Sequence, residues 1–388
     1  MQPLVVIGTG LAGYNLLKEF RKLNTEKEVV MITADDGTNY SKPMLSTGFT
    51  KQKTADELAM HSAQEMALQH NATVHTFSDV KSIDRAQKRI SVGKEGETFI
   101  IQYSDLVLAQ GAEVFEPLVS GDGQRLIYTV NDLLDYGRFR EALGGKKKVL
   151  IVGGGLIGCE FANDLANGGF QVELVEPVGR VLPSFLPEAG SQAVAAGLSE
   201  LGVQFYFGPT VDVVDLHEEG VRATLSNGQQ VDADLVLSAV GLRPRIALAQ
   251  AAGLEVGRGV SVDRQLRSLS DEHIYALGDC AQVDGRVLLY VLPLMASARA
   301  LAKTLAGAPT DVSYGVMPVT IKTPACPVVV SLPPLGADGE WHTEVAEGAD
   351  TQSVFLDARG EALGYALTGA TQIKQKMALN KTVPSIMV

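Results

Sequence analysis

The chain opens with a pattern of apolar and polar positions that predicts a parallel α/β unit. An apolar run at 4–7 is followed by glycines, an amphipathic stretch at 11–23 and a second apolar run at 29–33. Short, fully apolar runs are typical of strands buried on both faces, whereas the amphipathic stretch has the spacing of a helix. The order strand, glycine turn, helix, strand predicts that the two strands are parallel.

The same order of elements returns in the middle of the chain. Its strand, helix and strand are expected at 149–152, 156–168 and 172–176. In each half a later apolar run ends near a glycine: the run at 104–109 precedes Gly111, and the run at 234–239 precedes Gly241. A supersecondary plan that occurs twice predicts two domains of similar fold.

The remaining segments predict further helices, further strands and a third domain. The other helices are expected at 55–70, 132–143, 187–201 and 294–305, and the other early strands at 73–77, 88–92 and 274–279. The segment 39–49 predicts a loop or a short helix, and the Pro/Gly-bearing stretch 116–123 predicts a crossover between domains. After Tyr314 prolines become frequent and apolar runs alternate, which predicts an antiparallel α+β domain. Its elements are strands at 316–321, 328–331, 353–356 and 362–367 and a helix at 372–379.

Composition narrows the classes of function. The 388 residues are 46% apolar and 20% charged, and the net charge is −12. An acidic surface repels nucleic acid and anionic membranes, although a local basic patch can still dock an acidic protein. No run approaches the ~20 apolar residues that span a bilayer. A soluble, cytoplasmic protein without membrane insertion is therefore expected.

The three cysteines favour a reducing compartment. Cys159, Cys280 and Cys326 are far apart in the chain, and no CxxC or Cys/His cluster is present. An odd number of isolated cysteines argues against a disulfide framework and gives no support to a zinc or iron–sulfur site. No metal site is expected.

The first glycine turn has the GxGxxG spacing of a dinucleotide-binding turn. Its residues are Gly8, Thr9, Gly10, Leu11, Ala12 and Gly13. In such a turn the first glycine permits the bend, the second lets a pyrophosphate approach the backbone, and the third lets helix and strand pack closely. The N–H groups that begin the helix also favour phosphate. Asp35 and Asp36 end the second strand, where a carboxylate binds a ribose diol. A glycine turn with a structural role only is the alternative.

The second turn runs from Gly153 through Gly155 and Ile157 to Gly158. Glu176 ends its second strand, and a carboxylate there binds the 2′-hydroxyl of NAD and repels the 2′-phosphate of NADP. NADH is therefore favoured, although an arginine four residues later could accommodate a phosphate. Two turns require two dinucleotides, and hydride passes between nicotinamide and flavin in two-electron steps. FAD and NAD(H) are the expected cofactors.

Several motifs resemble those of the flavoprotein reductases with the glutathione-reductase-like fold. Besides the first turn they are LVLAQGA at 106–112, GGGLIGCE at 153–160, LVLSAVGLRP at 235–244 and IYALGDCA at 274–281. The resemblance implies an α/β fold of two Rossmann-like dinucleotide-binding domains and a C-terminal α+β domain. It implies an FAD-binding domain in two segments, 1–112 and 243–315, an NAD-binding domain at 113–242, and an interface domain at 316–388.

The segment after the first acidic strand indicates where the electrons go. Disulfide reductases of this fold carry a redox cysteine pair there, but the corresponding YSKPMLS stretch at 40–46 contains no cysteine. A thiol relay is therefore excluded, and the electrons are expected to leave for an external acceptor. Cys159 and Cys280 are interpreted as small packed hydrophobic residues.

The acceptor follows from resemblance alone. YSKPMLSTGF is similar to the loop of the bacterial reductases of rubredoxin, which supply electrons to alkane hydroxylases, and VTIKTPACPVVV at 319–330 resembles the same group. This implies that rubredoxin, or another small one-electron iron protein, is the partner. The alternatives are an NADH–ferredoxin reductase of an oxygenase system, from whose YxRPPLSK loop the chain departs, and a non-catalytic NAD/FAD-binding sensor.

The resemblance also implies which residues contact FAD. Carried over position by position, they are Thr9 to Ala12, Ala34, Asp35, Lys42, Val80, Glu160, Gly278, Asp279, Val291 and Lys322. Gly111 and Gly241 are expected to border the cofactors. The alternatives are an exposed lysine for Lys42, a solvated helix glutamate for Glu160 and a strand-end surface lysine for Lys322. No side chain is expected to act as an acid or base, because positioning supplies the rate.

Overall fold

The computed structural model describes residues 2–116 and 119–388. Residues 117 and 118 of the predicted crossover stretch lie outside the described residues. By its contacts the chain divides into two units. Unit 1 comprises Met1–Lys42, Glu57–Glu113 and Leu242–Tyr314, and unit 2 comprises Pro43–Asp56, Val114–Gly241 and Gly315–Val388.

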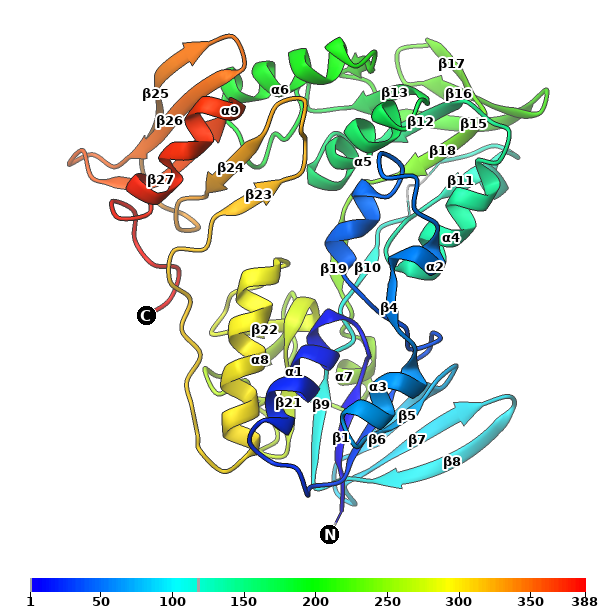
Figure 1. Ribbon diagram of the computed structural model, residues 1–388, viewed down its shortest axis with the longest axis vertical. Helices are drawn as coiled ribbons and strands as arrows, with labels where there is room; N and C mark the ends of the chain where they lie inside the picture. Colours follow the sequence, from blue (N-terminus) through cyan, green and yellow to red (C-terminus); the bar gives the residue numbers. More distant parts are fainter. Residues whose placement is uncertain (1, 117–118) are drawn as a thin grey trace. The chain divides into compact units, whose positions relative to one another are not determined.

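Unit 1 is built on a five-stranded parallel sheet in the order β21-β9-β1-β2-β5 (Figure 1). In chain order its strands are β1 (Leu4–Ile7), β2 (Val29–Ile32), β5 (Thr73–His75), β9 (Asp105–Leu108) and β21 (Ile274–Ala276). The central strands β1 and β2 are buried along their whole length, which explains their continuous apolar runs. Helix α1 (Leu11–Arg21) follows β1 and packs against α8 (Val291–Leu305).

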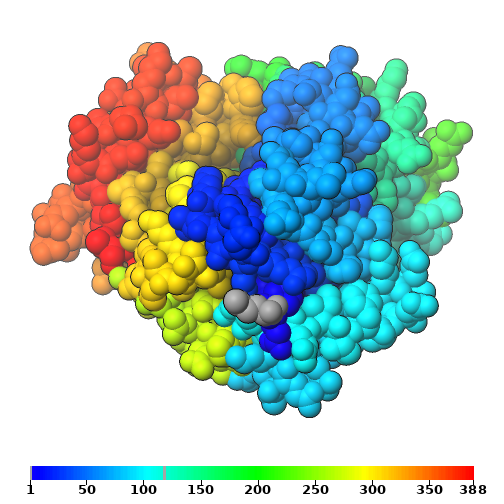
Figure 2. All heavy atoms as spheres, turned by 60° about the horizontal axis from the view of Figure 1, so that its bottom comes forward, coloured from blue at the N-terminus to red at the C-terminus, as the bar shows by residue number. Residues whose placement is uncertain are grey.

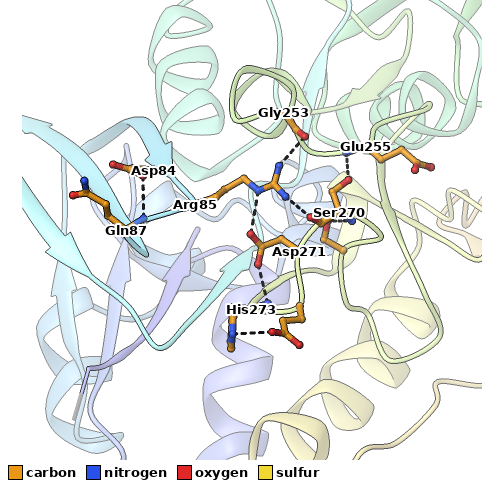
Figure 3. Close-up of polar contacts among 10 residues, drawn as sticks. Asp84, Arg85, Gln87, Gly253, Glu255, Ser270, Asp271 and His273 are labelled. Atoms are coloured by element: carbon orange, nitrogen blue, oxygen red, sulfur yellow. Dashed lines mark hydrogen bonds and ion pairs between the residues drawn. The ribbon is translucent and has the colours of Figure 1, made fainter.

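A three-stranded antiparallel sheet adds to unit 1. Its strands are β6 (Asp79–Asp84), β7 (Arg89–Lys94) and β8 (Glu97–Gln102). Arg85, just after β6, joins it to the segment before β21: its Nε donates to Asp271 Oδ2 at 3.0 Å and its guanidinium also donates to the carbonyls of Gly253 and Ser270 (Figure 3). The smaller elements are α3 (Ala63–Gln69), α7 (Ala247–Ala251), β3 (Asn39–Tyr40), β4 (Ala59–His61), β19 (Leu242–Pro244), β20 (Val260–Val262) and β22 (Ala281–Val283).

Unit 2 repeats the plan, which confirms the predicted duplication. Its parallel sheet has the order β11-β18-β12-β13-β14, with α5 after β12 as α1 follows β1. The elements are β11 (Ile127–Tyr128), α4 (Leu133–Ala142), β12 (Lys148–Val152), α5 (Leu156–Asn167), β13 (Gln171–Glu176), α6 (Glu188–Glu200), β14 (Gln204–Phe207) and β18 (Leu235–Ser238). Like unit 1, unit 2 also contains a three-stranded antiparallel sheet, formed by β15 (Val211–His217), β16 (Gly220–Leu225) and β17 (Gln230–Ala233).

The third predicted domain forms an antiparallel sheet within unit 2, in the order β23-β24-β27-β26-β25. Its strands are β23 (Val319–Ile321), β24 (Val328–Ser331), β25 (Glu340–Glu347), β26 (Asp350–Leu356) and β27 (Ala362–Thr368). Helix α6 packs on β26 and β27. The end of the chain also packs on the sheet, where Val383 joins a core with Val329, Tyr365 and Leu367. The predicted α+β domain is therefore confirmed.

Two predicted helices differ from the structure, whereas the loop or short helix predicted at 39–49 is confirmed as a short helix. The helix expected at 55–70 is instead α2 (Ala55–Leu58), strand β4 and helix α3, because β4 pairs with β3. The capping box of Ser62 and Glu65 starts α3 afresh. The helix expected at 372–379 is split into α9 (Gly369–Gln372), a 3₁₀ turn and α10 (Lys376–Leu379). The segment 39–49 holds β3 and a 3₁₀ helix at Lys42–Thr47.

Candidate functional site

The first glycine turn has the backbone geometry that a dinucleotide requires. Gly8 has φ +114°, and a Cβ added to it would lie 2.2 Å from the carbonyl oxygen of Ala109. A Cβ on Gly13 would lie 2.0 Å from the Gly8 carbonyl, so helix α1 and strand β1 pack as closely as the fingerprint predicts. A Cβ on Gly10 would meet nothing within 4 Å. The backbone at the start of α1 is thus open at the one glycine that a pyrophosphate must approach.

Asp35 is the carboxylate that lies beside this turn. Its Oδ1 accepts hydrogen bonds from Thr33 Oγ1 at 2.5 Å, from the Gly37 amide at 2.9 Å and from Thr9 Oγ1 at 3.4 Å. The contact with Thr9, inside the turn, places the acid at the end of β2 against the fingerprint. Asp36 instead accepts from the Thr38 amide. Asp35 is therefore the better fit to a ribose-binding acid.

The Gly278–Asp279 pair follows β21 and adjoins the same turn. Gly278 has φ +74°, and a Cβ added to it would lie 2.8 Å from the Ala12 side chain in α1. Burial raises the pKa of Asp279, and the cation of Lys42 opposes that rise. Among residues 2–116 and 119–388 no group donates a hydrogen bond to the Asp279 carboxylate. A half-buried carboxylate of this kind fits a ligand hydroxyl. Lys42 is half-buried rather than a freely exposed lysine.

The other predicted FAD residues of unit 1 lie on two named elements, β6 and α8, and in two connecting segments. Ala34 lies in the bend after β2, and Gly111 lies in the loop after β9. Val80 is in β6 and pairs with Val92. Val291 is the first residue of α8 and is 39% exposed. Gly111 has φ +69° with open space where its Cβ would be, and its carbonyl accepts from the Arg245 amide at 3.0 Å.

The second glycine turn, in unit 2, repeats the geometry of the first. Gly153 has φ +105°, and a Cβ on Gly158 would lie 1.9 Å from the Gly153 carbonyl oxygen. A Cβ on Gly155 would meet nothing within 4 Å. Ile157, in the first turn of α5, is 37% exposed. Gly241, at the end of the neighbouring strand, has φ +128°.

Glu176 is held against this turn by two backbone hydrogen bonds. Its Oε2 accepts from the Gly154 amide at 2.7 Å and its Oε1 accepts from the Val178 amide at 2.9 Å. The carboxylate is buried at the end of β13. Arg180 is turned to the Pro183 carbonyl, to which it donates at 3.4 Å. The backbone therefore fixes the Glu176 carboxylate at the position where the sequence predicts a ribose contact, which fits NAD better than NADP.

Glu160 and Lys322 form an ion pair in unit 2 between a buried carboxylate and a half-buried lysine. Glu160, on α5, is only 2% exposed, so it is not a solvated helix glutamate. The Lys322 ammonium donates to Glu160 Oε2, and the Lys322 amide donates to Glu160 Oε1 at 2.9 Å. Ser46 joins them, since its hydroxyl donates to Glu160 Oε2 at 2.6 Å and lies 3.0 Å from the Lys322 Nζ. The structure thus brings together two residues that are 162 apart in the chain.

Sequence reasoning missed a second carboxylate on the same helix. Asp164 is buried one turn after Glu160, and it accepts hydrogen bonds from the amides of Phe49 and Thr50 at 3.0 and 2.8 Å. Burial raises its pKa, while these two hydrogen bonds act in the opposite direction. Glu160 and Asp164 together hold the segment 43–56 on α5. Two acids four residues apart on a mostly apolar helix were the available signal.

The three cysteines are packed in the interior. All three are free and buried. Burial raises the pKa of the Cys159 thiol well above its usual range and that of Cys280 to about 11. A raised pKa keeps these thiols protonated near neutral pH, which disfavours a role as nucleophiles. In the described part of the chain no group of three metal-ligating side chains is found.

The two turns therefore fit two dinucleotides, one in each unit. In both, the middle glycine faces open space and a carboxylate ends the second strand. No helix within the described ranges has the length and apolar character needed to cross a membrane.

Comparisons with known proteins agree with this geometry. Residues 2–300 match the family described as pyridine nucleotide-disulphide oxidoreductase, and residues 311–383 match the rubredoxin binding C-terminal domain. The chain is 58% identical to a rubredoxin-NAD(+) reductase of Alcanivorax borkumensis over 100% of both chains. It is 43% identical to a rubredoxin-NAD(+) reductase of Acinetobacter baylyi, covering 100% of this chain and 99% of the relative.

The fold is also found in solved structures. An NAD-dependent persulfide reductase from A. fulgidus superposes with a TM-score of 0.90 and 22% identity, over 98% of this chain and 76% of the other. At that identity the likeness concerns the fold alone. The family matches and the full-length identities identify the chain as a member of the pyridine nucleotide-disulphide oxidoreductase family, in the group whose members carry a rubredoxin-binding C-terminal domain.

Proposed function

We propose that this chain is an NADH-dependent flavoprotein reductase that passes single electrons to rubredoxin. The observation that carries the proposal is the combination of two open glycine turns with a C-terminal sequence that matches a rubredoxin-binding domain. Relatives with 58% and 43% identity over their full length bear the name rubredoxin-NAD(+) reductase. Supply of electrons to alkane hydroxylases in the cytoplasm is the physiological role we propose.

The cofactor assignment follows the two turns. FAD binds the segments 1–112 and 243–315, NADH binds 113–242, and 316–388 forms the interface domain. The FAD-contacting residues are proposed to be Gly8 to Gly13, Ala34, Asp35, Lys42, Val80, Gly111, Glu160, Gly278, Asp279, Val291 and Lys322. The NADH-contacting residues are proposed to be Gly153, Gly155, Ile157, Gly158, Glu176 and Gly241. Two observations support this assignment: there is open space beside Gly10 and Gly155, and within the described ranges the Asp279 carboxylate accepts no hydrogen bond.

Bound FAD would supply the chemistry for uptake of a hydride from a nicotinamide and for release of its electrons singly. The chain's own side chains bind and orient. The fixed Glu176 carboxylate hydrogen-bonds a ribose 2′-hydroxyl and repels a 2′-phosphate. The ion pair of Glu160 and Lys322 holds the start of α5 against β23, and its cation supplies positive charge without a proton transfer. Because all three cysteines are buried and burial raises the pKa of each thiol, we expect the electrons to leave the protein without a thiol relay.

A comparison of acceptors tests the proposal. NADH oxidation is followed with ferricyanide, with rubredoxin and with a [2Fe–2S] ferredoxin. We expect activity with ferricyanide and a kcat/KM for rubredoxin that exceeds the value for ferredoxin. Faster reduction of ferredoxin would transfer the assignment to a ferredoxin reductase. If the protein is yellow with bound FAD but oxidises no NADH with any of these acceptors, the result would support the alternative of a non-catalytic sensor.

A further inference from the structure

The charges of the C-terminal domain are separated along the chain. Residues 362–388 contain three lysines, Lys374, Lys376 and Lys381, and no aspartate or glutamate. The preceding residues, 338–361, contain seven acidic residues and one arginine. In a chain with a net charge of −12, the last segment is therefore a local positive region.

Packing turns two of these lysines to the surface. The apolar side chains of Ile373, Leu379 and Val383 pack on the sheet core. Lys374 and Lys381 are exposed, whereas Lys376 is half-buried. Figure 2 shows the last part of the chain, in red, at the surface of the molecule.

A large apolar side chain accompanies the exposed lysines. Met377, between them in the chain, is 67% exposed. The segment is held in place by Tyr365, whose hydroxyl donates to Asn380 Oδ1 at 2.6 Å. We call Lys374, Met377 and Lys381 the lysine face.

The charges of the lysine face are not neutralised within the described structure. None of its lysines, nor Lys376, lies within 4.0 Å of a carboxylate oxygen in residues 2–116 and 119–388. The nearby acid Asp350 is engaged by the backbone: its Oδ1 accepts hydrogen bonds from the Thr371 and Gln372 amides at 2.9 and 3.3 Å. The hydrogen bond from the Thr371 amide is the main cause that lowers the pKa of Asp350, and the charge of Lys374 contributes least. The positive charges of Lys374 and Lys381 are therefore available to attract a negatively charged partner.

We propose that the lysine face is the surface on which rubredoxin docks, and that the docking face of the partner is acidic. This inference rests on the proposed function. The face lies inside the 311–383 match to a rubredoxin-binding domain. Charge complementarity raises the rate of encounter, and an exposed methionine is a residue type that is enriched where proteins meet. The acidic stretch 338–361 repels the same partner and so restricts how it approaches.

Charge reversal on the lysine face tests the proposal. In the double variant K374E/K381E we expect kcat/KM for rubredoxin at low salt to fall by about tenfold or more, since electrostatic steering changes association rates by ~10 to 1,000-fold. The dependence of that rate on salt should flatten. NADH–ferricyanide activity should be unchanged, because neither lysine is placed at a cofactor. K374Q/K381Q should give a smaller loss in the same direction.

A matched control carries the same change of charge elsewhere. Lys81 and Lys147 are exposed and lie outside the C-terminal domain. K81E/K147E should leave rubredoxin reduction within about twofold of wild type, because neither lysine belongs to the lysine face. M377A should raise KM for rubredoxin without changing the salt dependence.

The outcomes separate the inference from the function. If wild type and K374E/K381E reduce rubredoxin equally well, the lysine face is not the docking surface and the proposed function stands. The same conclusion follows if K81E/K147E loses as much activity toward rubredoxin as K374E/K381E does. If wild type reduces ferricyanide but no rubredoxin, the proposed function fails and the docking inference fails with it.

Discussion

The glycine turn of unit 2 allows ligand binding and folding to be perturbed separately. Gly155 and Gly158 are three residues apart, yet the space around them differs completely. A Cβ on Gly155 would meet nothing within 4 Å, whereas a Cβ on Gly158 would lie 1.9 Å from the Gly153 carbonyl oxygen. Gly155→Ala should therefore impair NADH binding without harming the fold, and Gly158→Ala should harm the fold itself.

The magnitudes follow from these environments. Gly155 has φ −75° and ψ −167°, which alanine adopts without strain. Alanine restricts the unfolded chain more than glycine does, which stabilises the folded protein by about 0.4–1 kcal/mol. Alanine is also a poorer N-cap, which destabilises the fold by a similar amount, so the free energy of unfolding should change by less than about 1 kcal/mol. The methyl group occupies the path of the pyrophosphate, and we expect NADH binding to weaken at least tenfold, about 1.4 kcal/mol. In Gly158→Ala the backbone must move, which costs about 1–3 kcal/mol or more.

Two measurements on each variant distinguish these effects. The KM for NADH is measured by ferricyanide reduction, and the free energy of unfolding by urea denaturation followed by fluorescence. Gly155→Ala should change only the KM, and Gly158→Ala should lower the stability. If Gly155→Ala leaves the KM for NADH unchanged, the turn does not hold the pyrophosphate. Loss of stability in Gly155→Ala comparable to that in Gly158→Ala would refute the geometric argument.

Three further predictions concern Glu176, the Glu160–Lys322 pair and Cys280. Glu176→Gln removes the charge that repels a 2′-phosphate, so the ratio of kcat/KM for NADH to that for NADPH should fall about tenfold or more; an unchanged ratio would show that another group selects the cofactor. Lys322→Met leaves the Glu160 carboxylate buried without its cation and should lower the free energy of unfolding by about 2–3 kcal/mol in urea. The double variant with Glu160→Gln should recover at least half of that loss, and no recovery would contradict a direct pairing. Because burial raises the pKa of Cys280 to about 11, iodoacetamide at pH 8 should leave NADH–ferricyanide activity intact; rapid inactivation would restore a role for a thiol.

The parallel sheets were predictable because their signals are local. Each central strand is a short apolar run next to a glycine turn, and burial on both faces requires that composition. The antiparallel sheet β6-β7-β8 was predicted only in part, because β8 alternates exposed and half-buried residues and carries few apolar side chains on its outer face. Strand β4 forms because it pairs with β3. The local sequence pattern does not indicate this pairing.

The site was predicted in the same uneven way. The turns, Asp35 and Glu176 occur at fixed spacings and were found from the sequence. The pairing of Glu160 with Lys322 depends on contact between residues far apart in the chain, and the contribution of Ser46 and Asp164 depends on how the segment 43–56 packs on α5. The sequence alone does not show which lysines at the end of the chain are exposed. The packing of the segment on the sheet shows that Lys374 and Lys381 face solvent.

The central claim is that electrons pass from NADH through this protein to rubredoxin. The most direct measurement mixes the yellow protein anaerobically with NADH and an excess of rubredoxin and follows the flavin and rubredoxin absorbance together in a stopped-flow instrument. We predict that the rubredoxin absorbance is lost with two rubredoxins reduced for each NADH oxidised, and at a rate that saturates with rubredoxin concentration. Bleaching of the flavin by NADH with no loss of rubredoxin absorbance would contradict the account.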